Sequence, residues 1–312
     1  MEDSHIAGTN LDNNVQVFGV FDGHGGNKQV IIDVGCEVAL YVKDKYVELL
    51  KNLPSFKSRD YPKALKESFI AIDELLVSPQ GKRDILRYRK SEDTQNAMFG
   101  RPETDDISMF TGCTACVALI TDTEIYCANS GDSRCVLSSK GTAIEMSMDH
   151  KPELPGERAR IEKAGGFVED NRVKGVLNLS RSLGDMEYKS DKSLTVENQM
   201  ITCVPEIKVE KLNKNHDFLV IACDGIWDCL TSQECITMVS EFMESPKAKG
   251  PLSLCIEQMF DKIIASDVAS SGKKISNKSR NSNKQFHLDA NFSIGGIGCD
   301  NMTAVVIQLK SQ

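Results

Sequence analysis

The chain has 312 residues, 40% of them hydrophobic and 26% charged, which is the composition of a globular protein that can bury a full core. Its net charge of −8 argues against nucleic acid as a partner, because there is no basic excess to displace counterions from phosphates. No apolar run approaches the roughly 18 residues of a membrane span, so we expect neither a membrane span nor a signal peptide.

The first predicted element is a buried, mostly apolar strand over 15–21. It ends in the turn DGHGG, and an amphipathic helical pattern follows over 27–50. A second helix is predicted over 62–77, where a proline suits the first helical turn. The polar stretch 78–108 has no periodicity and is predicted to be an insertion or a long loop.

The pattern then changes to that of β-strands, and 113–141 is predicted to form an antiparallel meander. Residues 155–164 are predicted to form a short helix that glycines stop, and 167–176 a hairpin. The residues 178–193 are polar and are predicted to form a surface flap.

The last third of the chain again combines strands with helices. The stretch 270–285, rich in Ser, Lys and Asn, is predicted to be disordered. Strands come in runs instead of alternating strictly with helices, so the fold class is predicted to be α+β, with sheets packed between helices. The elements predicted here are strands over 201–209, 218–223 and 302–309 and helices over 231–243 and 252–264.

The eleven cysteines lie mostly within apolar stretches, where a reduced cysteine behaves as a small hydrophobic side chain. Cys113 and Cys116 form a C-x-x-C, but no second pair stands at zinc-binding spacing. We therefore expect a reducing compartment, the cytoplasm or the nucleus.

Acidic residues recur at the ends of predicted strands. Glu2 and Asp3 begin the chain, Asp22 and Asp224 each follow an apolar strand, and Asp300 leads into the last one. Asp-Gly is also an ordinary turn signal, so each position alone could be a simple turn. Together they supply the oxygen ligands that Mg²⁺ or Mn²⁺ prefers, and several carboxylates stay ionised side by side only with cations between them.

Eight motifs make a family resemblance specific. The chain resembles the type-2C, metal-dependent serine/threonine protein phosphatases from residue 1 to about 309, broken at 78–108 and 270–299. The resemblance implies one catalytic domain over 1–312, built as a central β-sandwich of two mostly antiparallel sheets flanked by helices on both faces, a four-layer αββα arrangement. The motifs, in the order of that family, are MED, FGVFDGHGG, TGCTACV, ANSGDSR, DHKP, LNLSRSLGD, VIACDGIWD and DNMTAVV.

The resemblance also implies a ligand set for two Mg²⁺ or Mn²⁺ ions. Asp22 would bridge the two ions, Glu2 and the carbonyl of Gly23 would complete one shell, and Asp224 and Asp300 would hold the other ion. A weaker third-metal site of some members would use the carboxylate of the SGDSR motif. The residues implied are Glu2, Asp3, Asp22, Gly23, Asp132, Asp224, Asp228 and Asp300.

The implied substrates are phosphoserine and phosphothreonine side chains of proteins, and we expect the enzyme to act as a monomer. Two cations would clamp the phosphoryl oxygens and lower the pKa of a water for in-line attack. Asp22 and His24 are the catalytic candidates, with His24 as the general acid that protonates the leaving alkoxide. A structural histidine is the alternative for His24, and it is the interpretation preferred for His150. Residues 178–189 would form a flap beside the cleft.

One departure from the family pattern keeps other functions open. An arginine that the family places three residues before MED, where it binds the substrate phosphate, is not in this sequence. Loss of a bidentate guanidinium should weaken phosphate binding, so the 312 residues are expected to be a weaker catalyst than a chain with upstream sequence. The alternatives are a pseudophosphatase that works as a binding module and a metal-dependent hydrolase of small phosphoesters.

Overall fold

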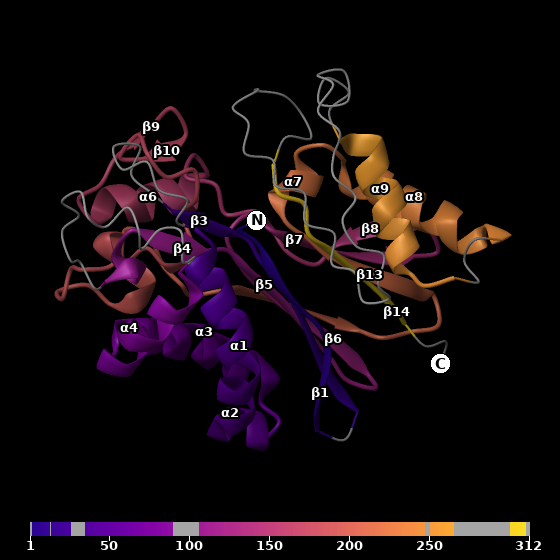
Figure 1. Ribbon diagram of the computed structural model, residues 1–312, viewed down its shortest axis with the longest axis horizontal. Helices are drawn as coiled ribbons and strands as arrows, with labels where there is room; N and C mark the ends of the chain where they lie inside the picture. The colour runs from indigo at the N-terminus through magenta and orange to yellow at the C-terminus, as the bar shows by residue number, and fades with distance from the viewer. Residues whose placement is uncertain are drawn as a thin grey trace.

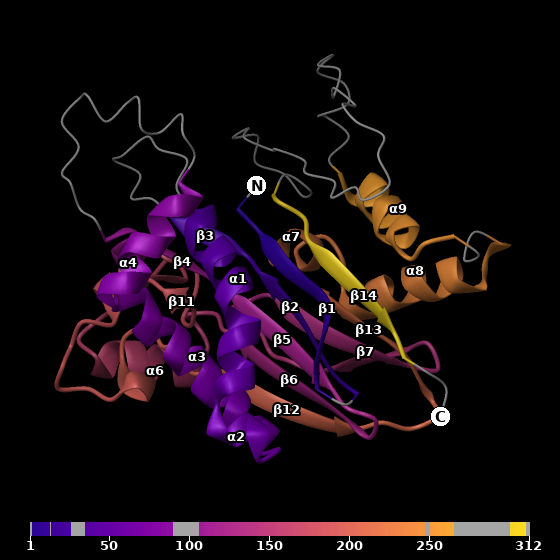
Figure 2. The same ribbon diagram turned by 60° about the horizontal axis from the view of Figure 1, so that its bottom comes forward.

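The computed structural model describes residues 2–12, 14–25, 35–89, 106–246, 250–264 and 300–309. Within them, two antiparallel sheets pack face to face, and helices cover the outer face of each sheet (Figures 1 and 2). The first sheet has five strands, in the order β1 (Ser4–Asp12), β2 (Val15–Phe21), β5 (Ala115–Ile120), β6 (Glu124–Ser130) and β12 (Glu206–Lys211). The second has four strands, in the order β14 (Ala304–Gln308), β13 (His216–Ala222), β7 (Arg134–Ser139) and β8 (Thr142–Glu145).

Hydrophobic side chains fill the three spaces between the four layers. Strand β13 shows this best, because it is buried on both faces. Val220 packs in the cluster under the C-terminal helices, whereas its neighbours Leu219 and Ile221 point into the cluster between the sheets. On β2, Val17 packs under the N-terminal helices and Val20 packs between the sheets. This two-residue alternation with both faces apolar explains the continuous hydrophobic runs in the sequence.

The helices lie in two groups. α1 (Cys36–Asn52) and α3 (Tyr61–Val77) pack against the five-stranded sheet, and α8 (Ser232–Glu244) and α9 (Ser253–Ile263) pack against the four-stranded one (Figure 2). The predicted capping box of α8 is present, with Thr231 and Glu234 each accepting from the other's backbone N–H. The predicted α+β fold with a four-layer αββα arrangement is confirmed. No helix among the described residues is long and apolar enough to cross a membrane.

A third, small sheet lies at one end of the sandwich. Its order is β11 (Leu183–Gly184), β4 (Thr111–Cys113) and β3 (Gly23–Gly25). Nearby, α6 (Pro155–Lys163) precedes the hairpin of β9 (Val168–Glu169) and β10 (Arg172–Val173), as predicted. The remaining helices of the described ranges are α2 (Pro54–Lys57), α4 (Pro79–Ile85) and the single turn α7 (Asp224–Trp227). The 3-10 turns described there are η1 (Leu86–Tyr88), η3 (Ile107–Met109), η4 (Met186–Tyr188) and η5 (Val196–Asn198).

Several predicted segments need correction. Strand β1 was not anticipated, because four of its residues in a row are exposed and break the alternation. The stretch 78–108 is not a loop throughout, since Ser78 accepts a hydrogen bond from the N–H of Gly81 and caps α4. Strand β12 begins at Glu206, five residues after the predicted start. The predicted start of the first helix near residue 27, the rest of the first insertion over 90–105 and the segment 270–299 lie outside the described residues.

The surface flap predicted over 178–193 is wrong for most of its length, because most of residues 179–189 are buried, whereas 190–193 are exposed as predicted. Glu157 of α6 accepts hydrogen bonds from Arg160, Ser180 and Arg181. Burial alone would raise the pKa of Glu157, but the hydrogen bonds from Arg181 and the charges of both arginines hold it at about 2. Polar residues can be buried when they satisfy one another, and a local polar composition does not reveal such partners.

Candidate metal centre

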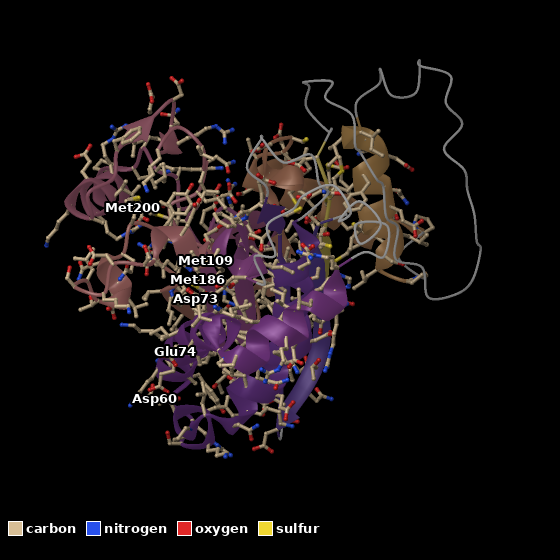
Figure 3. The ribbon with its side chains drawn as sticks, turned by 60° about the vertical axis from the view of Figure 1, so that its left-hand side comes forward. Asp60, Asp73, Glu74, Met109, Met186 and Met200 are labelled. Atoms are coloured by element: carbon tan, nitrogen blue, oxygen red, sulfur yellow. The ribbon has the colours of Figure 1, made fainter. Side chains whose placement is uncertain are left out.

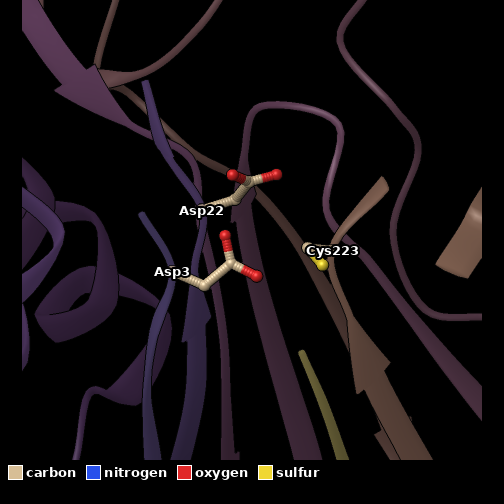
Figure 4. Close-up of side chains that lie close together, drawn as sticks. All are labelled: Asp3, Asp22 and Cys223. Atoms are coloured by element: carbon tan, nitrogen blue, oxygen red, sulfur yellow. The ribbon is translucent and has the colours of Figure 1, made fainter. Parts of the chain in front are cut away.

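The registers of the two sheets bring the strand ends together at one edge of the sandwich. Ser4 pairs with Phe21, so Asp3 lies opposite Asp22 in the antiparallel pair of β1 and β2. In the other sheet, Ala222 pairs with Ala304, so the residues after β13 lie beside those that precede β14. Figure 4 shows the carboxylates of Asp3 and Asp22 together with Cys223 at this edge.

Asp3, which is buried, and Asp22, which is half-buried, form the centre of the cluster. One ligand atom each from Asp3, Asp22 and Cys223 lies within 4.8 Å of the others. Both carboxylate oxygens of Asp3 are buried and accept no hydrogen bond from the residues that the structure describes. Burial raises the pKa of Asp3, and it raises the pKa of Asp22 together with the nearby charges of Asp3, Asp224 and Asp132. Such a set is unfavourable unless positive charge is placed among the oxygens.

Asp224 brings a carboxylate from the second sheet. It is the first residue of α7, directly after Cys223. Burial, followed by the charges of Asp132 and Asp300, raises its pKa to about 7. Gly225 lies so close to the residues before β14 that a Cβ atom at Gly225 would overlap the carbonyl oxygen of Asn301. This close approach keeps Asp224 beside Asp300.

Cys223 ties the two segments together instead of serving as an anionic ligand. Its Sγ accepts a hydrogen bond from the N–H of Thr303 at 3.1 Å and donates one to the carbonyl of Asn301 at 3.4 Å. Burial raises the pKa of Cys223 well above its usual value, and the charges of Asp3 and Asp22 act in the same direction. A neutral thiol is a poor ligand for a hard cation, so the donor set at this edge remains one of oxygen atoms.

Glu2 and Gly23 face each other at the open end of the first hairpin. A Cβ atom at Gly23 would overlap the backbone oxygens of Glu2 and Gly35. A Cβ atom at Gly35 would in turn lie 2.6 Å from Cδ of Glu2. Glycine at both positions therefore lets the backbone of Glu2 approach Gly23 and the side chain of Glu2 approach Gly35.

The residues implied for a third site differ in their burial. Asp132 is buried and forms an ion pair with Lys151, which lowers its pKa against the stronger effect of burial. Asp228 is exposed one helical turn after Asp224 and donates its N–H to the Asp224 carbonyl at 2.7 Å. Lys151 thus already supplies one positive charge to Asp132 from within the protein.

The histidines differ in their surroundings. His24 Nε2 lies 2.6 Å from Oδ2 of Asp185. Burial lowers the pKa of His24, but the charge and hydrogen bond of Asp185 outweigh it, and the net direction is upward. His150 is buried, its Nδ1 accepts from the N–H of Gly131 at 3.3 Å, and its Nε2 lies 3.5 Å from a carboxylate oxygen of Glu206; burial nevertheless lowers its pKa to about 3. This environment suits the scaffold role expected of His150.

Asp185 is the site residue that sequence reasoning missed. The motif LNLSRSLGD that contains it was recognised, but its aspartate received no role. Asp185 lies on the far side of β4 from His24, and nothing in the local sequence points to the pairing. A signal of a special position is the left-handed backbone of both Gly184 (φ 80°) and Asp185 (φ 52°), which only the structure reveals.

The donor atoms of the cluster suit a divalent cation with oxygen ligands. A hard cation would give the carboxylate oxygens of Asp3 a partner. It would also stabilise the ionised forms of Asp22 and Asp224, whose pKa values are raised without it, and it could bind the carbonyl oxygen of Gly23. Thiolate and imidazole ligands, which zinc prefers, are absent from the cluster within the described part of the chain. The residues present therefore fit Mg²⁺ or Mn²⁺.

Comparison with known proteins gives consistent results. A family model described as protein phosphatase 2C matches residues 1–272. The probable protein phosphatase 2C 3 of Paramecium tetraurelia is 39% identical over 312 residues, covering 99% of this chain and 88% of that protein. The probable protein phosphatase 2C 21 of Arabidopsis thaliana is 36% identical over 332 residues, covering 99% of this chain and 83% of that protein.

Solved structures share the fold. A sex determining protein of C. elegans aligns with a TM-score of 0.64 at 24% identity, over 99% of this chain but 61% of the other, so the match spans less than two thirds of that protein. A phosphatase from Toxoplasma gondii aligns with a TM-score of 0.62 at 22% identity, over 84% and 83% of the two chains. At these identities the likeness concerns the fold alone.

Proposed function

This chain belongs to the protein phosphatase 2C family of protein serine/threonine phosphatases, and we propose that it uses two bound divalent cations, Mg²⁺ or Mn²⁺, to hydrolyse phosphoserine and phosphothreonine in proteins. The observation that carries the proposal is the cluster of Asp3, Asp22 and Asp224, drawn from strand ends of both sheets, with two buried carboxylate oxygens that accept no hydrogen bond from described residues.

Each carboxylate has a place in the proposed site. Asp22 would be shared between the two cations, because it senses the charges of both Asp3 and Asp224. Glu2 and the Gly23 carbonyl would complete one ligand shell, and Asp224 with Asp300 the other. When bound, the cations would supply Lewis acidity toward the phosphoryl oxygens and toward a water nucleophile. A weaker third site at Asp132, Asp224 and Asp228 would have to compete with Lys151.

His24 is the proposed general acid. It follows Gly23 at the edge of the carboxylate cluster, and the charge and hydrogen bond of Asp185 raise its pKa against the effect of burial. Departure of a serine or threonine alkoxide requires a proton, and a positioned imidazolium can donate it. The intact set of carboxylates and this histidine favour catalysis over a binding module.

The ten described cysteines are free thiols, which supports a reducing compartment such as the cytoplasm or the nucleus.

The test is phosphate release from a phosphothreonine peptide, compared with a small phosphoester such as p-nitrophenyl phosphate, in Mn²⁺ or Mg²⁺. We expect EDTA to abolish turnover of the peptide and excess Mn²⁺ to restore it. Without cations, the carboxylates supply no Lewis acid to bind the phosphoryl oxygens or to activate a water. Turnover that persists in EDTA would contradict the proposal. Hydrolysis of only the small ester would favour the small-phosphoester alternative, and Mn²⁺ binding without turnover would favour a binding module.

A further inference from the structure

We propose that Asp185 is a positioning residue that holds the imidazole of His24 in the orientation from which it protonates the leaving oxygen. The inference rests on the proposed function, since it assigns a partner to the general acid. The carboxylate of Asp185 is buried, and its Oδ2 lies 2.6 Å from His24 Nε2. The hydroxyl of Ser182 donates to the same oxygen at 2.5 Å.

The small third sheet explains why the two side chains meet. His24 on β3 and Gly184 on β11 both pair with Gly112, which lies on the strand between them. A Cβ atom at Gly112 would overlap Oδ2 of Asp185 and lie 2.7 Å from Nε2 of His24. Because Gly112 has no side chain, the aspartate and the histidine can form their hydrogen bond directly across the middle strand.

The backbone of Asp185 is fixed from several sides. Its N–H donates to the carbonyl of Thr111 at 2.9 Å, and its φ of 52° places it in the left-handed region. The neighbouring Gly184 donates its N–H to Oδ1 of Asp73 on α3 at 2.9 Å, and the ammonium of Lys189 pairs with Oδ2 of Asp73 at 2.5 Å. Asp73 and Met186, the residue that follows Asp185, are both labelled in Figure 3. A strained conformation that is held this firmly often serves a functional site.

The chemical consequence concerns the two ring nitrogens. Nε2–H of His24 donates to Asp185, so Nδ1 is the nitrogen left to exchange a proton with substrate. In the Ser-His-Asp template, an aspartate likewise fixes the tautomer and orientation of a histidine, and its loss lowers kcat strongly while the geometry persists. Asp185 would act through His24 in this way, without touching substrate.

The decisive experiment uses Asp185→Asn with two leaving groups. Asparagine keeps the size and tolerates the left-handed backbone, but it offers an amide that permits a second ring tautomer. We expect kcat on a phosphothreonine peptide to fall by about 10²-fold with little change in KM, since an alkoxide needs the proton. On p-nitrophenyl phosphate, whose leaving group departs without a proton, the loss should stay below about threefold.

A double variant separates positioning from a general structural role. If Asp185 acts only through His24, adding Asp185→Asn to His24→Gln should cause no further loss on the peptide. Gly112→Ala should give the same peptide-selective loss, because its methyl group would push the two side chains apart. Asp191→Asn is the matched control, because the exposed carboxylate of Asp191 in the same segment accepts hydrogen bonds from the N–H and the hydroxyl of Ser193, and turnover of this variant should be unchanged.

Two results would overturn the inference: an equal loss on both substrates by soluble Asp185→Asn and Gly112→Ala proteins, or a double variant that is additively worse than His24→Gln. Wild-type protein without metal-dependent turnover would instead refute the proposed function. The two failures are therefore distinguishable.

Discussion

Asp224→Asn is expected to lower kcat for a phosphothreonine peptide by at least about 10³-fold, because one carboxylate ligand is worth several kcal/mol of transition-state stabilisation when it holds a cation in place. The substitution keeps the shape of the side chain and removes its charge. The measurement is phosphate release at saturating Mn²⁺. Asp261→Asn, at an exposed position on α9, is the control and should retain full activity.

The same variant has a second readout in metal-free protein. The pKa of Asp224 is raised from 3.8 in the unfolded chain to about 7 in the fold, so the ionised form is disfavoured by folding. Below pH 3.8 Asp224 is protonated in both states, and its contribution to the stability of the fold is fully present. This contribution is lost as the pH rises through about 7 and the folded protein must hold an ionised Asp224. Metal-free Asp224→Asn should therefore melt several degrees higher than metal-free wild type at pH 7.5. An inactive variant that also melts lower would point to structural damage instead of a lost ligand.

His24→Gln is expected to reduce kcat on the phosphothreonine peptide by about 10² to 10³-fold, in the range that general acid catalysis contributes. Glutamine cannot become a cation and cannot deliver a proton to the departing alkoxide. Turnover of p-nitrophenyl phosphate and the affinity for Mn²⁺ should change little. If both substrates lost activity equally, or if neither did, His24 would be a structural residue and the alternative interpretation would hold.

Local sequence patterns were sufficient to predict the α+β class and the carboxylates at the strand ends, whereas the four layers were implied by the family resemblance. The apolar run 218–223 indicated a strand, and the aspartate after it was expected at the strand end. Asp22 and Asp224 could be grouped because each ends a strand, and the registers of the sheets then place them together.

The errors arose where a residue depends on a distant partner. The segment 178–193 was predicted to be exposed because it is polar, yet Glu157 and Asp73 hold polar groups of its first part inside the fold, whereas its end at 190–193 is exposed. Asp185 was missed because its partner His24 is 161 residues away, and only the shared neighbour Gly112 brings them together. Such contacts have no periodicity, so neither composition nor spacing could have indicated them.

The central claim is that carboxylates from the strand ends of two sheets share two divalent cations, and equilibrium dialysis against Mn²⁺ tests it most directly. We expect about two tightly bound Mn²⁺ ions per wild-type chain and at most one in Asp22→Asn, because this carboxylate would contact both. A wild-type chain that binds no Mn²⁺, or a metal count that Asp22→Asn leaves unchanged, would contradict the account.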